Sequence, residues 1–520
     1  MDVQEQHRLV EALRDPGRYP HPADHIEHCE THISHVLLAG DFAYKLKKPL
    51  NLGFLDFTEL TQREHYCREE LRLNARLAPI YLDVVAITGT PDDPQVAGAG
   101  EVIEWAVKMR RFDESSRLDH QLGAGRVSVA MIEGLARRVA ACHHEAHAAD
   151  PARGYGTPEA VAAPMRENFD QIRPALADPS ERDRLERLGQ WTKQRLSALE
   201  PIYQQRLATG HVRECHGDMH LANMIALDNG EVAVFDGIEF NTQLRWIDVA
   251  SEIAFAVMDL DCRDAPALAS RFLDQWLAIT GDYAALSVFP PYAVYRAMVR
   301  AKTTAIRLGQ DDTTPEEARA LGADLASYLH LGERYARASA PAVAITRGIA
   351  GTGKSTAAAA LIERHGAIRL RADVERRRLS PDPDPAVRYS QQAHDRVYTR
   401  LEDLARQITE AGFPVVIDAT FIEHHRRVPF ERLAGEHGLP FCILDMHVPL
   451  EVLEQRIVQR QQTGNDPSEA DVAVMHRQRE RLEPLSATER EAAVTVDNSG
   501  ESPIVPALGW LHARGLDAAE

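Results

Sequence analysis

The segment HGDMHLANMIALDNGEVAVFDGIEFNTQLRWID, residues 216–248, gives the strongest indication of the fold of the N-terminal part of this chain. Within it, two short apolar runs, MIAL and VAVF, lie on either side of the Asn229-Gly230 pair. An Asn-Gly pair between apolar runs of this length predicts a β-hairpin. The hairpin places Asn223 just before its first strand and Asp236 just after its second. We therefore expect these two side chains at the same end of the hairpin.

Three side chains in this segment suit phosphoryl transfer from ATP. That reaction needs a carboxylate that orients the attacking hydroxyl and accepts its proton, and ligands for the magnesium ion that neutralises the phosphates. Asp218 fits the first role, and Asn223 and Asp236 fit the second. For any one of these residues, an ordinary polar loop is an adequate explanation. The order and spacing of the set, together with His216 and His220, match the catalytic constellation of kinases.

The segment resembles the catalytic and metal-binding loops of the aminoglycoside phosphotransferase/choline kinase group, which are small-molecule relatives of protein kinases. The resemblance implies that Asp218 is the catalytic base and that Asn223 and Asp236 are magnesium ligands. It also implies that His216 and Asp248 support the loop without reacting. ATP and Mg²⁺ are the cofactors expected on this basis.

The composition is typical of a soluble globular protein with more than one domain. Of 520 residues, 44% are hydrophobic and 26% charged, and a chain of this length predicts about two to four domains. The net charge of −19 disfavours general nucleic-acid binding, which depends on surplus Lys and Arg. The six cysteines form no CxxC pair, residues 1–15 lack the apolar core of a signal peptide, and no membrane-spanning apolar run is present. We expect a cytoplasmic protein with reduced cysteines and no membrane association.

Upstream of the opening segment, two apolar runs around Gly40 predict a second hairpin. Because side chains alternate along a strand, its second strand places Lys45 and Lys47 on one face. A lysine on such a strand, paired with a glutamate from the following helix, is how kinase folds hold the phosphates of ATP. In that helix, Glu70 fits the partner position best and Glu69 second. A surface lysine beside a surface glutamate is the alternative.

Five histidines are concentrated in residues 21–35. A metal cluster is one interpretation of them. No pair among them has the usual ligand spacing to a Cys or a carboxylate, so we expect solvated or packed histidines instead. The five are His21, His25, His28, His32 and His35.

A second motif follows residues 336–341, where small residues and a proline interrupt the helical pattern and where we place the domain boundary. The sequence GIAGTGKST (348–356) follows an apolar strand and precedes an alanine-rich helix, as the P-loop pattern G-x-x-x-x-G-K-S requires. Its backbone N–H groups surround the β-phosphate at the positive end of the helix. Lys354 is expected to bridge the β- and γ-phosphates, and Ser355 to bind magnesium. The residues expected to bind the nucleotide are Gly348, Gly351, Thr352, Gly353, Lys354, Ser355 and Thr356.

Charged residues downstream of the P-loop are candidates for the chemistry. A predicted strand ends near Asp373, with Arg376 three residues on, and a second predicted strand ends at Asp418, a candidate carboxylate for the water shell of the magnesium. Farther on, Arg456 and Arg460 lie on one helix face, which suits a lid that closes over transferring phosphates. For each arginine alone, a solvated helix face is the alternative.

This half resembles the small P-loop kinases, among them the kinase domain of polynucleotide kinase, zeta toxins and gluconate kinase. The resemblance implies that Asp373 receives the proton of the substrate hydroxyl and that Arg376 binds nearby. It likewise implies that Arg456 and Arg460 are lid arginines. In this order, the two halves resemble a bacterial family of bifunctional aminoglycoside phosphotransferase/ATP-binding proteins, a name that describes architecture and implies no substrate.

The predicted fold class is α/β and α+β in two domains. Residues 1–338 are expected to form a bilobal protein-kinase-like domain, and residues 339–520 a P-loop NTPase domain with a parallel sheet flanked by helices. The predicted function is an ATP- and Mg²⁺-dependent phosphotransferase with two kinase-type sites, each acting on a hydroxyl of a small molecule.

Three alternatives remain open. In the first, only the P-loop half is catalytic and the N-terminal half binds or regulates. In the second, the P-loop half phosphorylates 5′-hydroxyl ends of nucleic acid. In the third, the P-loop is a nucleotide-dependent switch for a partner protein and transfers no phosphate.

Overall fold

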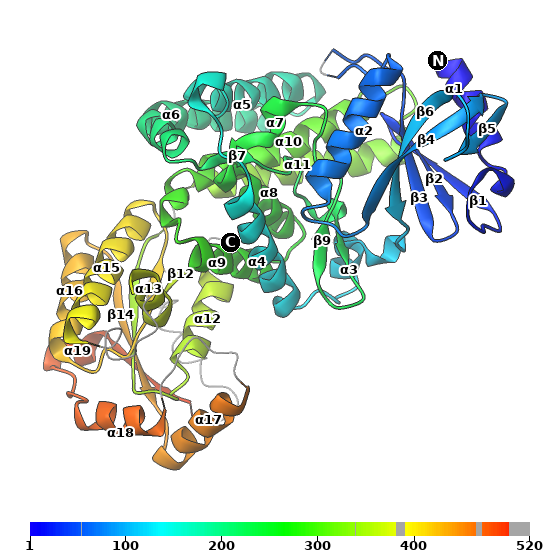
Figure 1. Ribbon diagram of the computed structural model, residues 1–520. Coiled ribbons are helices and arrows are strands. Elements are labelled where there is room, and N and C mark those ends of the chain that lie inside the picture. The colour runs from blue at the N-terminus through cyan, green and yellow to red at the C-terminus, as the bar shows by residue number, and fades with distance from the viewer. Residues whose placement is uncertain (54, 338–339, 381–389, 464–470, 499–520) are drawn as a thin grey trace. The chain divides into compact units, whose positions relative to one another are not determined.

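The computed structural model describes residues 1–53, 55–337, 340–380, 390–463 and 471–498 (Figure 1). The chain divides into two compact units. The first comprises Met1–Asn168 and Leu196–Asp259, and the second comprises Phe169–Arg195 and Leu260–Glu520. The domain boundary predicted between residues 338 and 339 falls outside the described ranges and stays a prediction.

A six-stranded antiparallel sheet forms the N-terminal part of the first unit, with strand order β1-β2-β3-β6-β4-β5. The hairpin predicted around Gly40 is confirmed as β2 and β3. Side chains of β3 alternate between two faces, so Tyr44 and Leu46 pack with α1, whereas Lys45 and Lys47 point towards α2. The elements of this part are α1 (Val3–Ala12), β1 (Ile26–Glu30), β2 (Ser34–Ala39), β3 (Phe42–Lys47), α2 (Leu60–Asn74), β4 (Tyr81–Thr90), β5 (Asp93–Val96) and β6 (Val102–Arg110).

The hairpin predicted from the Asn229-Gly230 pair is confirmed as β8 and β9, which pair antiparallel. Asn223 directly precedes β8, and Asp236 lies two residues after β9. A second short sheet pairs β7 with β10, so the chain before and after the hairpin is held together. The elements in this stretch are α3 (Leu118–Gly123), α4 (Val129–Glu145), α5 (Pro158–Ile172), α6 (Pro179–Ala208), β7 (Val212–Glu214), β8 (Met224–Ala226), β9 (Val232–Val234), α7 (Thr242–Arg245), β10 (Trp246–Asp248) and α8 (Val249–Cys262).

The C-terminal part of the second unit contains a five-stranded parallel sheet, with strand order β12-β13-β11-β14-β15. Every residue of β11 and β13 is buried, as expected for central parallel strands that are covered on both faces. The alanines of α12 pack closely against Val416 and Leu444, and α15 and α16 contact β13 and β11. The predicted parallel sheet with flanking helices is therefore confirmed.

Helices α9 to α11 precede this sheet and belong to the same unit. Helix α9 contacts α12 and β12, and a buried ion pair joins Asp274 on α9 to Arg369 on β12 at 2.7 Å. Besides parts of α5, α6 and α8, the elements of the second unit are α9 (Pro266–Thr280), α10 (Phe289–Leu308), α11 (Pro315–Ala336), β11 (Val343–Arg347), α12 (Lys354–His365), β12 (Ile368–Arg371), α13 (Ala372–Leu379), α15 (Gln391–Glu410), β13 (Val415–Asp418), α16 (His424–Glu436), β14 (Phe441–His447), α17 (Leu450–Thr463), α18 (Val472–Glu480), α19 (Ala487–Ala492) and β15 (Ala493–Asp497).

The six cysteines all lie within the described ranges and are free thiols. None of the helices in those ranges combines the length and the apolar composition that crossing a bilayer requires.

Helix α2 is fixed to the N-terminal sheet by a fully buried ion pair. The Nε atom of Arg63 lies 2.9 Å from both carboxylate oxygens of Glu104 on β6, and neither side chain is exposed. Gln6 on α1 donates a further hydrogen bond to the same carboxylate. The pair therefore sets the position of α2, which carries Glu70.

Replacing Glu104 by Gln should leave the Arg63 guanidinium buried without its counter-charge. We expect the free energy of unfolding to fall by about 3–5 kcal/mol, the typical cost of breaking a buried ion pair. Glu64→Gln is the matched control, because Glu64 pairs with Arg68 on the solvent side of the same helix, and it should cost less than about 1 kcal/mol. Urea unfolding followed by circular dichroism measures both losses. Equal losses would show that the buried pair does not fix α2.

Candidate active sites

The loop that carries Asp218 is held by two buried carboxylates from α8. Glu252 accepts hydrogen bonds from the backbone N–H groups of His216 and Gly217, at 2.6 and 2.9 Å. Asp259 accepts one from the N–H of Leu221 at 2.8 Å. Sequence reasoning missed both residues, although two acidic residues within the apolar run of α8 were a usable signal.

His216 supports the same loop through both ring nitrogens. Its Nδ1 accepts a hydrogen bond from the N–H of Asp218 at 3.3 Å, and its Nε2 donates to the carbonyl of Phe235 at 2.8 Å. The supporting position that the resemblance implied for His216 therefore agrees with the geometry. Asp248 is the last residue of β10, directly before α8, and forms a buried ion pair with Arg206 at 2.7 Å.

Asp218 and Asn223 are in direct contact. The Nδ2 atom of Asn223 lies 3.0 Å from both the carbonyl and the Oδ2 atom of Asp218. His220 Nε2 is 3.3 Å from the same Oδ2 atom, and the Asp218 side chain is 35% exposed. The amide thus fixes one carboxylate oxygen while the group stays accessible. The N–H of Phe235 donates to the Asn223 carbonyl at 2.9 Å, which brings the residue before Asp236 against this loop.

Lys45, Glu70 and Asp236 form a second cluster at the junction of β3, α2 and the segment after β9. Lys45 Nζ lies 2.9 Å from Glu70 Oε1 and also pairs with Asp236. Glu69, the second choice from the sequence, pairs with Arg72 at 2.8 Å instead. The structure therefore places Glu70 at the lysine, as predicted.

Two residues of this cluster were not among the predicted site residues. Lys47 Nζ lies 2.7 Å from the other oxygen of Glu70 and also pairs with the buried carboxylate of Glu239. Burial alone would raise the pKa of Glu70, but the ammonium groups of Lys45 and Lys47 outweigh burial and lower it. Lys47 follows from the strand alternation, whereas nothing local in the sequence identified Glu239.

Asp236 adopts a left-handed backbone conformation, with φ of 62°. Non-glycine residues in this region carry strain and are concentrated at functional sites. The conformation is held from both sides, since Tyr81 OH accepts from the N–H of Asp236 at 3.1 Å and Asn74 Oδ1 accepts from the N–H of Gly237 at 2.7 Å. The Asp236 side chain remains 46% exposed.

The P-loop connects β11 to α12, as predicted. Gly351 and Gly353 have positive φ angles of 87° and 85°. A Cβ at Gly353 would lie 1.8 Å from the side-chain amide of Asn498, and one at Gly351 would meet Ile457 on α17 at 3.3 Å. The Asn498 amide donates to the carbonyl of Thr352 at 2.9 Å, so the residue after β15 closes the loop. Asn498 was missed because it lies far along the chain.

Lys354 and Ser355 lie at the start of α12. Lys354 Nζ donates to the carbonyl of Ile349 at 2.8 Å, so its side chain folds back along the loop. Ser355 Oγ donates to Asp418 Oδ2 at 2.7 Å, which brings these two predicted magnesium ligands together. Thr356 is exposed in the first turn of the helix.

The remaining predicted residues lie on two helices, α13 and α17. Asp373 and Arg376 pair with each other on α13; the Asp373 side chain is 34% exposed and that of Arg376 is buried. Arg456 on α17 donates to the carbonyl of Asn498 at 2.8 Å. The side chain of Arg460 lies outside the part of the chain that the structure describes.

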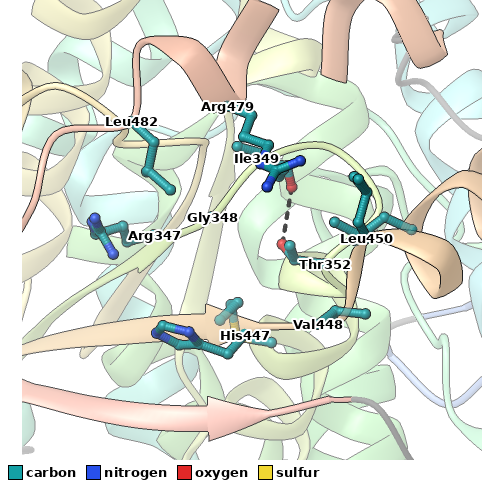
Figure 2. Close-up of a pocket in the computed structure, with 11 residues that line it drawn as sticks. Arg347, Gly348, Ile349, Thr352, His447, Val448, Leu450, Arg479 and Leu482 are labelled. Atoms are coloured by element: carbon teal, nitrogen blue, oxygen red, sulfur yellow. Dashed lines mark hydrogen bonds between the residues drawn. The ribbon is translucent and has the colours of Figure 1, made fainter. Parts of the chain in front are cut away.

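A cavity of about 200 Å³ lies beside the first half of the P-loop (Figure 2). Arg347, His447 and Arg479 contribute its charged or polar side chains, and Thr352 Oγ1 hydrogen-bonds the carbonyl of Ile349 at its edge. Lys354, Ser355, Asp373 and Asp418 are not part of its lining. Two of the predicted nucleotide-binding residues, Gly348 and Thr352, do line it, so the cavity shares the first half of the P-loop with the predicted phosphate site.

The two halves of the chain match two known families. Residues 54–289 match the Phosphotransferase enzyme family, and residues 343–485 match an AAA domain. The predicted order, a phosphotransferase-like half followed by a P-loop half, is confirmed.

Relatives in mycobacteria match most of the chain. The uncharacterized protein Rv2004c of Mycobacterium tuberculosis (strain ATCC 25618 / H37Rv) is 31% identical over 453 residues, which are 85% of this chain and 88% of the relative. The uncharacterized protein Mb2027c of Mycobacterium bovis shows the same identity and coverage.

Solved structures align at low similarity. A choline/ethanolamine kinase family protein from Mesorhizobium loti aligns with 64% of this chain and 98% of its own, at 11% identity and a TM-score of 0.39. A sugar kinase from Janibacter sp. HTCC2649 aligns with 34% of this chain and 99% of its own, at 19% identity and a TM-score of 0.28.

Replacing Gly353 by Ala should prevent the P-loop from closing. The added methyl group would collide with the Asn498 amide, so we expect nucleotide binding at this site to weaken at least about 100-fold, or by about 2.7 kcal/mol or more. Gly412→Ala is the matched control, because Gly412 also has a positive φ, of 93°, but nothing lies within 4 Å of the added atom. Titration with a fluorescent ATP analogue measures the difference. If both variants bind equally well, Asn498 does not constrain the loop.

Proposed function

The chain belongs to the family of Rv2004c and joins a phosphotransferase domain to an AAA domain, and from this premise we propose that it is an ATP- and Mg²⁺-dependent kinase with two separate active sites. Each site transfers the γ-phosphate of ATP to a hydroxyl group of a small molecule. The N-terminal site is centred on Asp218, and the C-terminal site on Lys354.

The main support for the first site is that Lys45 pairs with both Glu70 and Asp236. These residues come from a strand, a helix and a loop that are far apart in the sequence, and Glu70 is fully buried. A solvated lysine would need no such partner. A lysine with only 12% of its side chain exposed, held by a glutamate next to an acidic residue, is the arrangement that binding of ATP phosphates needs.

In the first site, Asp218 acts as the base. Asn223 orients one oxygen of its carboxylate, and the exposed part of the group can accept the proton of a substrate hydroxyl as the hydroxyl oxygen attacks phosphorus. Lys45 binds the phosphate oxygens, and Glu70 holds Lys45 in place. This division of roles needs no covalent intermediate on the protein.

The residues of the first site fit a magnesium ion. The side chains of Asn223 and Asp236 offer the hard oxygen ligands that Mg²⁺ prefers. In the cluster that contains Asp236, the carboxylates of Glu70, Asp236 and Glu239 outnumber the two lysine ammonium groups. A bound ion would supply positive charge that neutralises the phosphates during transfer.

In the second site, Lys354 and the backbone of the P-loop bind the phosphates. Ser355 and Asp418, 2.7 Å apart, would hold a magnesium ion directly or through its water shell. Asp373 accepts the proton of the acceptor hydroxyl, and Arg376, its ion-pair partner on α13, holds the carboxylate in position.

Asp218→Asn and Lys354→Ala test whether both sites are catalytic. Each substitution should lower phosphoryl transfer at its own site by about 10²–10⁴-fold, the contribution expected of a positioned base or phosphate ligand. The other site should keep its activity. Phosphorylated products from a panel of hydroxyl-bearing metabolites, analysed by mass spectrometry for each variant and for the double variant, measure the transfer.

The same experiment can overturn the proposal. If Lys354→Ala alone abolishes every product, the first site is not an independent kinase. If the double variant produces as much as the unaltered protein, neither assignment holds. If ATP binds tightly but no metabolite is phosphorylated, the P-loop acts as a nucleotide-dependent switch and both kinase assignments fail.

Glu70→Gln tests the role of the buried carboxylate at Lys45. The substitution removes the charge that positions both lysines, so we expect the KM for ATP at the first site to rise at least about tenfold, equivalent to about 1.4 kcal/mol. Glu69→Gln is the matched control, since the neighbouring Glu69 pairs with Arg72 and does not contact the cluster lysines. Steady-state kinetics measures the KM for ATP of both variants. Equal KM values for the two variants would show that Glu70 has no role in binding ATP.

A further inference from the structure

Three potential metal ligands lie together on the edge hairpin of the N-terminal sheet, outside both proposed active sites. Glu30 on β1 is directly opposite His35 on β2, and His28 is opposite Leu37. Because side chains on a strand alternate, His28 and Glu30 point to the same face as His35. The diagonal between His28 and His35 is within reach of side chains of this length.

The distances match those in a metal centre. His28 Nε2 lies 3.1 Å from His35 Nδ1, and one ligand atom from each of the three residues lies within 4.8 Å of the others. Zn–N bonds of about 2.0–2.1 Å in tetrahedral geometry place two nitrogen ligands about 3.3 Å apart. The two imidazoles are therefore already near the separation that a shared ion requires.

The surroundings also define which ion would fit. His35 is buried, His28 is half-buried, and the Glu30 side chain is 58% exposed, so the site is open to solvent on one side. Imidazole ligands select zinc, nickel or copper over magnesium.

Lys48 competes with a metal ion for the carboxylate of Glu30. Its Nζ lies 2.7 Å from Glu30 Oε1, and it donates to the carbonyl of Thr31. In the absence of a metal, this ion pair occupies the carboxylate, and the two imidazoles share a hydrogen bond. A divalent ion would displace the ammonium group from Glu30 and replace the imidazole hydrogen bond with two coordinate bonds.

We propose that His28, Glu30 and His35 form a binding site for one divalent transition-metal ion of the zinc class, with a water molecule as the remaining ligand. The ion would link β1 to β2 and so fix the edge of the sheet that contains β3 and Lys45. The site is independent of the magnesium ligands proposed for phosphoryl transfer.

Titration of the metal-free full chain with Co²⁺, in excess Mg²⁺ to occupy oxygen-rich sites, tests the proposal. We expect one Co²⁺ per chain with visible d–d absorption bands, and displacement of that ion by one equivalent of Zn²⁺. His28→Gln and Glu30→Gln should each weaken binding at least tenfold. Lys48→Ala should strengthen it severalfold, because it removes the cation that competes for Glu30.

His25→Gln is the matched control, since His25 is an exposed histidine on the same segment that pairs with Glu27 instead. It should leave the affinity within twofold. The proposal fails if His28→Gln binds Co²⁺ as tightly as the unaltered protein does, or if His25→Gln weakens binding equally. It also fails if no spectroscopically defined Co²⁺ site forms. His28 and Glu30 are not fully buried, so their variants remain informative if a His35 variant does not fold.

Discussion

Glu70 fixes the geometry of the first candidate site because one carboxylate binds two lysines. Its two oxygens accept from Lys45 and Lys47, and the carboxylate is fully buried. A shift of α2 by one residue in register, about 1.5 Å along its axis with a turn of about 100°, would carry the Glu70 carboxylate away from the lysines. The buried Arg63–Glu104 pair opposes such a shift from the other part of the helix. The position of Lys45 therefore depends on the packing of the whole helix against the sheet.

The two candidate sites use different means to hold a loop in place. In the first, carboxylates from α8 accept the backbone N–H groups of the loop, so helix side chains determine its shape. In the second, glycine conformations determine the shape, and a single amide from Asn498 closes it. Both loops also need a glycine, since a Cβ at Gly217, which has a φ of 88°, would lie 2.7 Å from the carbonyl oxygen of Leu244.

Local sequence patterns were sufficient for the residues that act within one turn or one hairpin. The Asn229-Gly230 hairpin and the P-loop follow from neighbouring residues, and Glu70 follows from its helix. Glu239 and Asn498 could not be predicted in this way, because each contacts a residue more than a hundred positions away. The histidine cluster shows a different limit, because its residues are close in sequence and only the register of the two strands brings them together. Linear spacing disfavoured a metal site, whereas strand pairing brings a carboxylate opposite a histidine.

The closure of the P-loop by Asn498 has a consequence for synthesis of the chain. The amide reaches Thr352 from 146 residues further along. While the ribosome is still translating that interval, the glycine turn exists without the group that completes it. A nascent polypeptide can thus expose the loop early yet gain its finished shape only after β15 has joined the sheet. A prematurely terminated product would lack the amide that closes this loop.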